Sequence, residues 1–457
     1  MQNAVFFAKF VMMATGKKDK GRGISSQIKT VFRSLQHRNY RLFFGGQSIS
    51  LIGTWMQRIA LPWLVYQMTG SEVLLGIVGF AAQIPSFLLA PVAGVLIDRW
   101  SRYRVLVVTQ VISMIQAGIL AWLSLSGSLE IWHIIALSLI MGCINAFDMP
   151  ARHSFVIDMV ENKDDMGNAI ALNSMMFNGA RLIGPSIAGI VLATTGEGIC
   201  FLINAVSYIF IIISLLAMHV PVYNEKKKKT RIFSELKEGL AYAFGFPPIK
   251  SIILLLGLVS LMGASYQVLM PVYAKDILQG DSHTFGFLMG AAGAGALLGA
   301  VYLASRKSVM KLGRLIPAST GLLSAGLVAM AFNTSFLLSM FFMFFTGLGM
   351  MAQTAASNTI IQTITDDDKR GRVMSLYTMA LMGTAPFGSL LAGWMAKLLG
   401  TPWTIFIGGF VCLIGALVFY KKLPILKKIV RPVYVRMGII PAVAEGIQAG
   451  SEPPAEG

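Results

Sequence analysis

Long apolar runs alternate with short polar stretches along most of the chain. A helix that crosses the hydrocarbon core of a bilayer needs about 20 mostly apolar residues. Twelve runs approach or exceed that length, and they lack the short alternation of membrane β-strands. The pattern therefore predicts an all-α membrane protein with twelve transmembrane helices. The expected spans are Leu42–Tyr66, Val73–Ile97, Val105–Ser124, Ile131–Phe147, Ala169–Thr194, Ile199–Val220, Ile252–Tyr273, Thr284–Leu303, Leu315–Phe332, Phe336–Ala356, Val373–Leu399 and Thr404–Tyr420.

A polar stretch after the sixth run divides the helices into six and six. It includes the solvated charge run Lys226–Lys229. We expect two pseudo-symmetric six-helix bundles joined by this linker. The expected parts are a cytoplasmic N-terminal extension (1–38), a first bundle (39–220), the cytoplasmic linker (221–250), a second bundle (251–423) and a cytoplasmic tail (424–457).

Basic residues gather on one predicted side of the membrane. Of the 38 Lys and Arg residues, 34 lie in the N-terminal segment, in the tail or in the connections that follow even-numbered spans. Cytoplasmic loops of membrane proteins carry such an excess. Both termini are therefore expected in the cytoplasm, in a multi-pass protein of the inner membrane. The net charge of +17 then needs no nucleic-acid partner.

Composition narrows the function classes. Hydrophobic residues make up 55% of the chain and charged residues 13%, about half the usual share in soluble domains. Three distant cysteines, Cys143, Cys200 and Cys412, form no disulfide framework or zinc motif. The five histidines form no metal-binding pattern, and no GxxxxGK[ST] loop for ATP occurs. We expect no metal and no cofactor.

The two halves share an internal repeat. A shift of 204 residues aligns the fifth and eleventh spans with seven identities, several of them at glycine. The matches include Gly179 with Gly383 and Gly184 with Gly388. Parallel repeats are typical of transporters whose site lies between the halves near the bilayer midplane. Convergence on small residues for helix packing is the alternative explanation.

The connection between the second and third spans carries a motif. Residues 94–104 read Gly-Val-Leu-Ile-Asp-Arg-Trp-Ser-Arg-Tyr-Arg. This resembles the signature loop of the major facilitator superfamily, with Ser101 and Tyr103 where that family usually has glycine and lysine. Further stretches resemble the bacterial branch that contains the enterobactin exporter and macrolide efflux proteins. They are Gly53–Trp63, Asp148–Arg152, Asn168–Asn173, Gly184–Pro185 and Arg370–Tyr377.

Charges around this loop predict a latch between two access states. Asp98 is placed to face the N-terminal end of the eleventh helix near Arg372. Asp148 and Arg152 lie four residues apart on one helical face, as candidate partners for Arg102. Ordinary juxtamembrane anchoring is the alternative. The expected conformational gate comprises Gly94, Asp98, Arg99, Arg102, Asp148, Arg152 and Arg372.

Polar residues inside the spans mark a candidate substrate site. Arg181 falls about 18 Å into a core of about 30 Å, and an ionisable group at that depth is a functional candidate by default. Clamping of backbone carbonyls or of Asn145 is the structural alternative. Arg58 lies nearer the outer face, where snorkelling also explains it. The candidate substrate-binding residues are Arg181, Asn178, Arg58, Gln57, Gln267 and Gln353.

Gly184, Pro185 and Gly189 resemble the antiporter motif of the fifth helix, and we assign them to helix packing. No Asp or Glu occupies a mid-span position, so Asp148 is the nearest candidate for a proton carrier. Proton coupling is implied by the resemblance alone.

The resemblance implies a monomeric secondary transporter that works by alternating access. Its expected substrates are amphipathic small molecules such as drugs, macrolides or siderophores. A lipid or lysophospholipid translocator is the alternative within the same class. A membrane enzyme would need a nucleophile, a metal or a paired-acid site, and the sequence contains no such pattern. A transporter-like sensor would need an added output domain, and no such pattern is found either.

Overall fold

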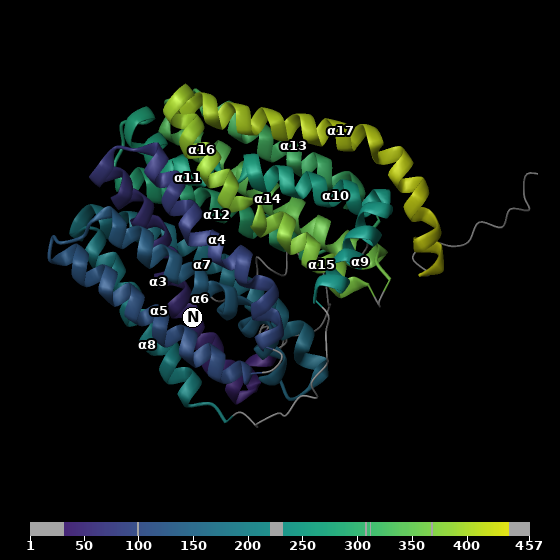
Figure 1. The fold of residues 1–457 in the computed structure, drawn as a ribbon, viewed down its shortest axis with the longest axis horizontal. Coiled ribbons are helices and arrows are strands. Elements are labelled where there is room, and N and C mark those ends of the chain that lie inside the picture. The colour runs from purple at the N-terminus through teal and green to yellow at the C-terminus, as the bar shows by residue number, and fades with distance from the viewer. Residues whose placement is uncertain are drawn as a thin grey trace, which may run out of the picture.

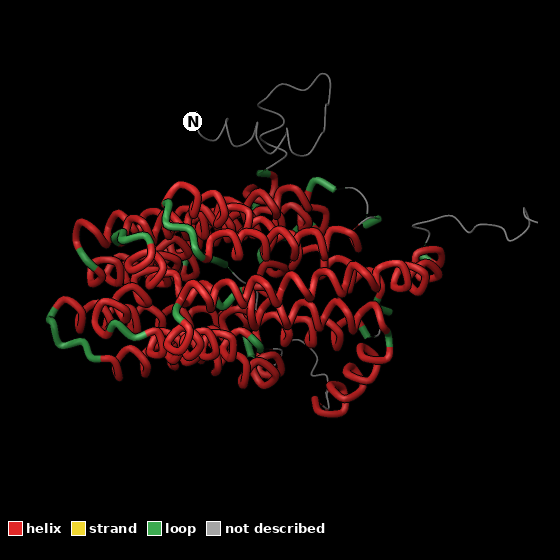
Figure 2. The backbone as a smooth tube through the Cα atoms, turned by 90° about the horizontal axis from the view of Figure 1, so that it is seen from above, coloured by secondary structure: helices red, strands yellow, loops and turns green. Residues whose placement is uncertain are grey.

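The computed structural model describes residues 32–97, 100–219, 232–306, 309–310, 312–366 and 369–437. Throughout these ranges the regular structure is helical, and most helices run along one common direction (Figure 2). The first half contains η1 (Arg33–Gln36), α3 (Arg38–Thr69), α4 (Glu72–Ile97), α5 (Arg102–Leu125), α6 (Ile131–Asp158), η2 (Lys163–Asp165), α7 (Met166–Thr195) and α8 (Glu197–Leu216). The second half contains α9 (Ile232–Gly245), α10 (Pro247–Leu258), η3 (Val259–Gly263), α11 (Tyr266–Val272), η4 (Tyr273–Ile277), α12 (Ser282–Ala304), α13 (Leu312–Ala331), α14 (Phe336–Ile364), α15 (Arg370–Thr378), η5 (Met379–Gly383), α16 (Ala385–Leu399) and α17 (Thr401–Arg436).

Eleven helical stretches within the described residues are long and apolar enough to cross a membrane. The remaining expected span corresponds to α3, which has 32 residues but carries polar side chains such as Gln47, Gln57 and Arg58. Several helices continue past the apolar runs. The fourth span was expected to end at Phe147, whereas α6 continues to Asp158, and α17 continues from the expected Tyr420 to Arg436.

Two spans of the second half are interrupted by π-helix. The seventh consists of α10, η3, α11 and η4, and the eleventh of α15, η5 and α16. The two interruptions nearest the middle contact each other, because Ser260 Oγ of η3 donates to the carbonyl of Leu381 in η5 at 2.5 Å. Thr384 donates in the same way to the carbonyl of Gly257 at 3.2 Å. Such π-segments loosen a helix locally and occur often at functional sites.

Tight turns gather at one end of the bundle, which we call the Gly70 end. Gly70 ends α3 with a left-handed φ of 58°. The repeat-related Gly196 and Gly400 both have a φ of 86° and separate consecutive helices. Only glycine adopts these conformations at little cost. The opposite end, which holds the loop at Trp100, is called the Trp100 end.

The two halves lie beside each other, with the purple-to-teal helices on one side and the green-to-yellow helices on the other (Figure 1). One hydrophobic cluster combines both halves, and its first-half members, such as Trp63, Leu75 and Phe201, lie toward the Gly70 end. A second cluster belongs to the first half alone and contains residues near the Trp100 end, such as Tyr40 and Phe155. The halves therefore share a core toward the Gly70 end.

Close packing of α4 on α16 and of α7 on α12 holds the halves together. A Cβ atom added to Gly76 would lie 3.2 Å from the Cα of Gly393. One added to Gly189 would lie 3.1 Å from the Cα of Gly286. Both crossings depend on glycine because a larger residue would push the helices apart.

Candidate functional site

Specific side-chain contacts join the halves at the Gly70 end. The Tyr66 hydroxyl of α3 donates a hydrogen bond to the Asp276 carboxylate of η4. Lys275 Nζ lies 5.6 Å from the centre of the Tyr66 ring. The rings of Trp63 and Phe285 stack across the halves with their centroids 5.8 Å apart. These contacts close this end.

Two ion pairs between described residues near the Trp100 end lie within single halves. Arg102 of α5 pairs with Asp158 of α6 at 3.2 Å, whereas the sequence offered Asp148 and Arg152 as candidate partners. This expectation was wrong because α6 continues past Phe147 and carries Asp158 to the start of α5. In the second half, Arg372 pairs with Glu238 at 2.6 Å. Each of these two pairs ties neighbouring helices of one half.

Part of the expected latch cannot be compared with these contacts. Gly94 lies within α4, while Asp98 and Arg99 lie outside the described residues. The expected approach of Asp98 to the eleventh helix therefore stays a prediction.

Asp148 lies inside the first half, with only 2% of its surface exposed. Its carboxylate accepts hydrogen bonds from Thr109 Oγ1 at 3.0 Å and Gln110 Nε2 at 2.6 Å, both on α5. It also forms the ion pair with Arg152 that the four-residue spacing predicts. A buried charge of this kind needs such partners. Asp148 of α6 thus links α6 to α5 through buried hydrogen bonds.

Two arginines share one indole ring near the middle of the first half. The Arg58 Cζ lies 5.0 Å from the centre of the Trp55 ring, and the Arg181 Cζ lies 5.7 Å from it. Trp55 and Arg58 come from α3, and Arg181 comes from α7. Cations are attracted to the face of an indole ring, so Trp55 partly stabilises both charges.

The Arg58 side chain is exposed, and the Arg181 side chain is half-buried. The backbone of Arg181 lies at the interface between the halves, since a Cβ on Gly293 of α12 would meet its carbonyl oxygen. Insertion of one arginine at a helix centre costs about 2.5–3.5 kcal/mol. Neither guanidinium group pairs with an acid among the described residues, so no such ion pair offsets this insertion cost.

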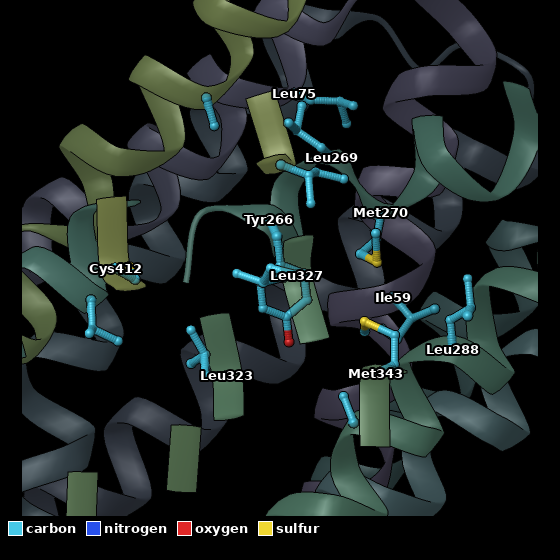
Figure 3. Packing of buried hydrophobic residues seen from close by; sticks show 14 of the residues in the cluster. Ile59, Leu75, Tyr266, Leu269, Met270, Leu288, Leu323, Leu327, Met343 and Cys412 are labelled. Carbon is cyan, nitrogen blue, oxygen red and sulfur yellow. The ribbon is translucent and has the colours of Figure 1, made fainter. Parts of the chain in front are cut away.

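Tyr266 of α11 is a buried polar residue of the opposite half. Its side chain is 3% exposed, and its hydroxyl has no hydrogen-bond partner of normal geometry among the described residues. The hydroxyl points away from Leu75 and Leu269 (Figure 3). The side-chain amide of Gln267, the next residue, lies near the Tyr266 hydroxyl. A buried hydroxyl without a partner is unusual and needs an explanation.

The other candidate residues of the second half contact their own half. Gln267 Nε2 lies 3.9 Å from the Met350 sulfur, a weak acceptor. Gln353 is fully buried in α14 and accepts from the Thr354 hydroxyl at 3.4 Å. Its Nε2 has no partner among the described residues.

The remaining candidates of the first half are held by neighbours within that half. Gln57 is 5% exposed, donates to Gln116 at 3.2 Å and accepts from Asn204 at 2.7 Å. The Asn178 amide donates to the carbonyl of Ser174 one turn earlier, at 2.9 Å. These contacts stabilise α3, α5, α7 and α8.

The packing motif of the fifth helix lies at two interfaces. Gly184 faces α3, where an added Cβ would lie 2.5 Å from the Trp55 Cβ. Gly189 faces Gly286 of α12, whose own added Cβ would meet the Pro185 carbonyl at 2.7 Å. The motif therefore brings α7 close to both Trp55 and the second half, which positions Arg181 between them.

Two residues that complete these features, Tyr266 and Asp276, were not predicted. Tyr266 adjoins the candidate Gln267, so a polar residue with an aromatic neighbour at mid-span was an available signal. Asp276 lies at the end of the seventh span, but no pattern in the sequence connects it with Tyr66, which is 210 residues away.

Comparisons with known proteins agree with this architecture. The sequence pattern of the transmembrane secretion effector family matches residues 29–433. The staphyloferrin A transporter of Staphylococcus aureus is 27% identical, with 83% of this chain and 95% of that protein covered. The multidrug efflux pump Tap of Mycobacterium tuberculosis is 27% identical over 73% of this chain and 81% of its own length. Macrolide efflux protein A of Streptococcus pyogenes is 20% identical over 84% and 96%.

Solved structures share the fold at lower identity. A bacterial homologue of the human lysosomal transporter Spinster, described as inward-facing and unoccupied, has a TM-score of 0.63 at 13% identity, with 87% of this chain and 98% of that chain covered. The peptide-transporter-family protein PepTSo has a TM-score of 0.66 at 12% identity, with coverage of 86% and 99%. The chain therefore belongs to the transmembrane secretion effector family and is a multi-pass transporter of the major facilitator superfamily, not an enzyme.

Proposed function

We propose that this transporter exports amphipathic small molecules, such as drugs, macrolides or siderophores, by alternating access. The observation that carries the proposal is the unequal contact between the halves. They share a core and hydrogen bonds at the Gly70 end, while the first half keeps a separate core near the Trp100 end. Between the ends lie two arginines, Arg58 and Arg181, that form no ion pair with a described acid. A site between two rocking halves is the arrangement on which alternating access depends.

The direction of transport follows from orientation. The positive-inside rule supports a cytoplasmic Trp100 end, because the basic residues gather in the connections and terminal segments of that predicted side. In that orientation, in the inner membrane, the Gly70 end faces outward and is closed. The described conformation then accepts molecules from the cytoplasm, which suits an exporter. Relatives named for multidrug and macrolide efflux support the same direction.

Coupling to protons would need a group that gains or loses a proton between states. Asp148 is the candidate, because its carboxylate is buried and paired with Arg152. Separation of α5 and α6 would break its bonds to Thr109 and Gln110 and expose the carboxylate to protonation.

The direct test is transport by the purified full-length protein in proteoliposomes. Staphyloferrin A, radiolabelled erythromycin and a fluorescent lysophospholipid serve as probes, each with and without an imposed pH gradient. Liposomes without protein are the control. Gradient-dependent movement of either soluble probe supports the proposal. Movement of the lysophospholipid alone would replace it with lipid translocation, and movement of none of the three would contradict it.

A further inference from the structure

Arg58 and Arg181 form an unusual pair of charges. Both guanidinium groups approach the same ring, Trp55, at 5.0 and 5.7 Å. Because like charges repel each other, two guanidinium groups on one ring are less favourable than one. A purely structural clamp between α3 and α7 would need one cation on the ring, not two.

Among the described residues, neither arginine forms an ion pair with an acid. The nearby acid Asp148 is already engaged by Arg152, Thr109 and Gln110. The two arginines therefore give an excess of positive charge around Trp55.

Tyr266 adds a hydrogen-bond donor from the second half. Its buried hydroxyl lacks a hydrogen-bond partner among the described residues and can donate a hydrogen bond to an oxyanion. The candidate groups are then two guanidinium groups, on α3 and α7, and one phenol on α11. Guanidinium groups match the geometry of carboxylate and phosphate oxygens, and hydrogen bonds between charged groups are the strong ones.

We propose that Arg58, Arg181 and Tyr266 bind an oxyanion, a carboxylate or a phosphate, on the transported molecule. The inference rests on the proposed function and restricts its substrates to amphipathic organic anions. The Trp55 ring holds both arginines in place. Bound anion neutralises them and contacts both halves, so that occupancy favours the state in which the halves approach each other around the site.

Matched probes separate charge from shape. We would use 7-diethylaminocoumarin-3-carboxylic acid, its methyl ester, its cationic aminoethyl amide and the corresponding 3-phosphonic acid. Binding to the full-length protein in nanodiscs is followed by fluorescence anisotropy. We expect the carboxylate or the phosphonate to bind at least tenfold more tightly than the ester and the amide. The tighter of these two anions identifies the preferred group.

Substitutions of the three proposed residues test whether the anion binds at this site. Arg181→Gln and Arg58→Gln should each weaken anion binding about tenfold or more, Arg181→Lys less, and leave ester binding unchanged. Tyr266→Phe, which removes a single oxygen atom, should weaken it several-fold. Lys397→Gln removes an exposed cation of α16 and should change nothing. Thermal unfolding without probe checks that each variant is folded.

The inference would be overturned if the anions and the methyl ester bound equally tightly. It would also be overturned if Arg181→Gln and Tyr266→Phe weakened the binding of the ester as much as that of the anions. Proteoliposome transport separates this from the proposed function. Arginine-independent export of an uncharged or cationic probe would overturn the anion site while the exporter stands. If the anion binds in an arginine-dependent way but no probe is transported, the anion site is supported and the proposed export function is contradicted.

Discussion

The fifth and eleventh spans are related by the internal repeat, yet they contribute polar groups in different ways. The fifth is one continuous helix, α7, with Arg181 facing the interface between the halves. The eleventh is broken by the π-segment η5, and the position 204 residues after Arg181 is Ala385. The first half thus supplies charge from an uninterrupted helix. The second half supplies irregular backbone and a neutral hydroxyl, Tyr266.

The difference indicates a division of work between the halves. Charged side chains need fixed partners inside a membrane, and Trp55 and the Asp148 network provide them in the first half. The π-segments of the second half leave helix geometry irregular, and Ser260 and Thr384 hold the carbonyls there. We infer that the first half recognises the substrate and that the second half bends during transport.

The largest expected effect comes from the charge network of the first half. Asp148→Leu leaves Arg152 buried without its partner and should lower the free energy of unfolding by about 3–5 kcal/mol. Thermal unfolding in detergent measures the loss. The double variant Asp148→Leu/Arg152→Met removes both charges and should recover much of it. Equal instability of the double variant would show that Asp148 acts through hydrogen bonds to α5 instead.

Arg181→Gln should reduce transport per folded molecule about tenfold or more, because a hydrogen bond to a charged group contributes about 1.5–3 kcal/mol. Arg181→Lys should retain part of the activity. Ala385→Gln introduces the same amide at the repeat-related position and is the matched control, with little effect expected. Equal losses in the two glutamine variants would remove the distinction between the fifth and eleventh spans.

Tyr66→Phe tests the closed end. The variant removes the hydrogen bond to Asp276 across the halves and should shift the equilibrium by about 1.5 kcal/mol toward opening at the Gly70 end. Spin labels at Ser71 and Gly280, in a background without native cysteines, report the distance between the halves. We expect a larger population of long distances. An unchanged distribution would mean that helix packing alone closes this end.

The smallest effect is expected in the second half. Ser260→Ala frees the carbonyl of Leu381 and should cost only about 0.5–1 kcal/mol. Hydrogen exchange should nevertheless quicken in residues 379–383 and stay unchanged in the repeat-related residues 175–179. Equal exchange in both segments would contradict the role of η5 as the flexible element.

Apolar run length and loop charge predicted most of the architecture, because both act locally along the chain. The seventh span was expected as one run, Ile252–Tyr273, and the structure divides it with two π-segments. Run length carries no information on such breaks. The partner that stabilises η5, Ser260, lies 121 residues away from Leu381.

The candidate site was predictable only in part. Arg181 was predictable because a charge at mid-span is costly. The repeat-related position is Ala385, so the helix packing common to both halves does not require a charge there. Its neighbours were not predictable, since Trp55 and Tyr266 reach it through the packing of three helices. The partner of Arg102 was mistaken because α6 extends as helix beyond its apolar run.

The central claim is that the halves must separate at the Gly70 end in every transport cycle. Ser186 of α7 and Gly290 of α12 lie opposite each other there, with 3.8 Å between the Ser186 Cβ and a Cβ placed on Gly290. That separation suits a disulfide. In a background without native cysteines, oxidation of Ser186→Cys/Gly290→Cys should abolish transport in proteoliposomes, and reduction should restore it, while each single variant stays active in both conditions. Undiminished transport by the fully cross-linked protein would contradict alternating access through this interface.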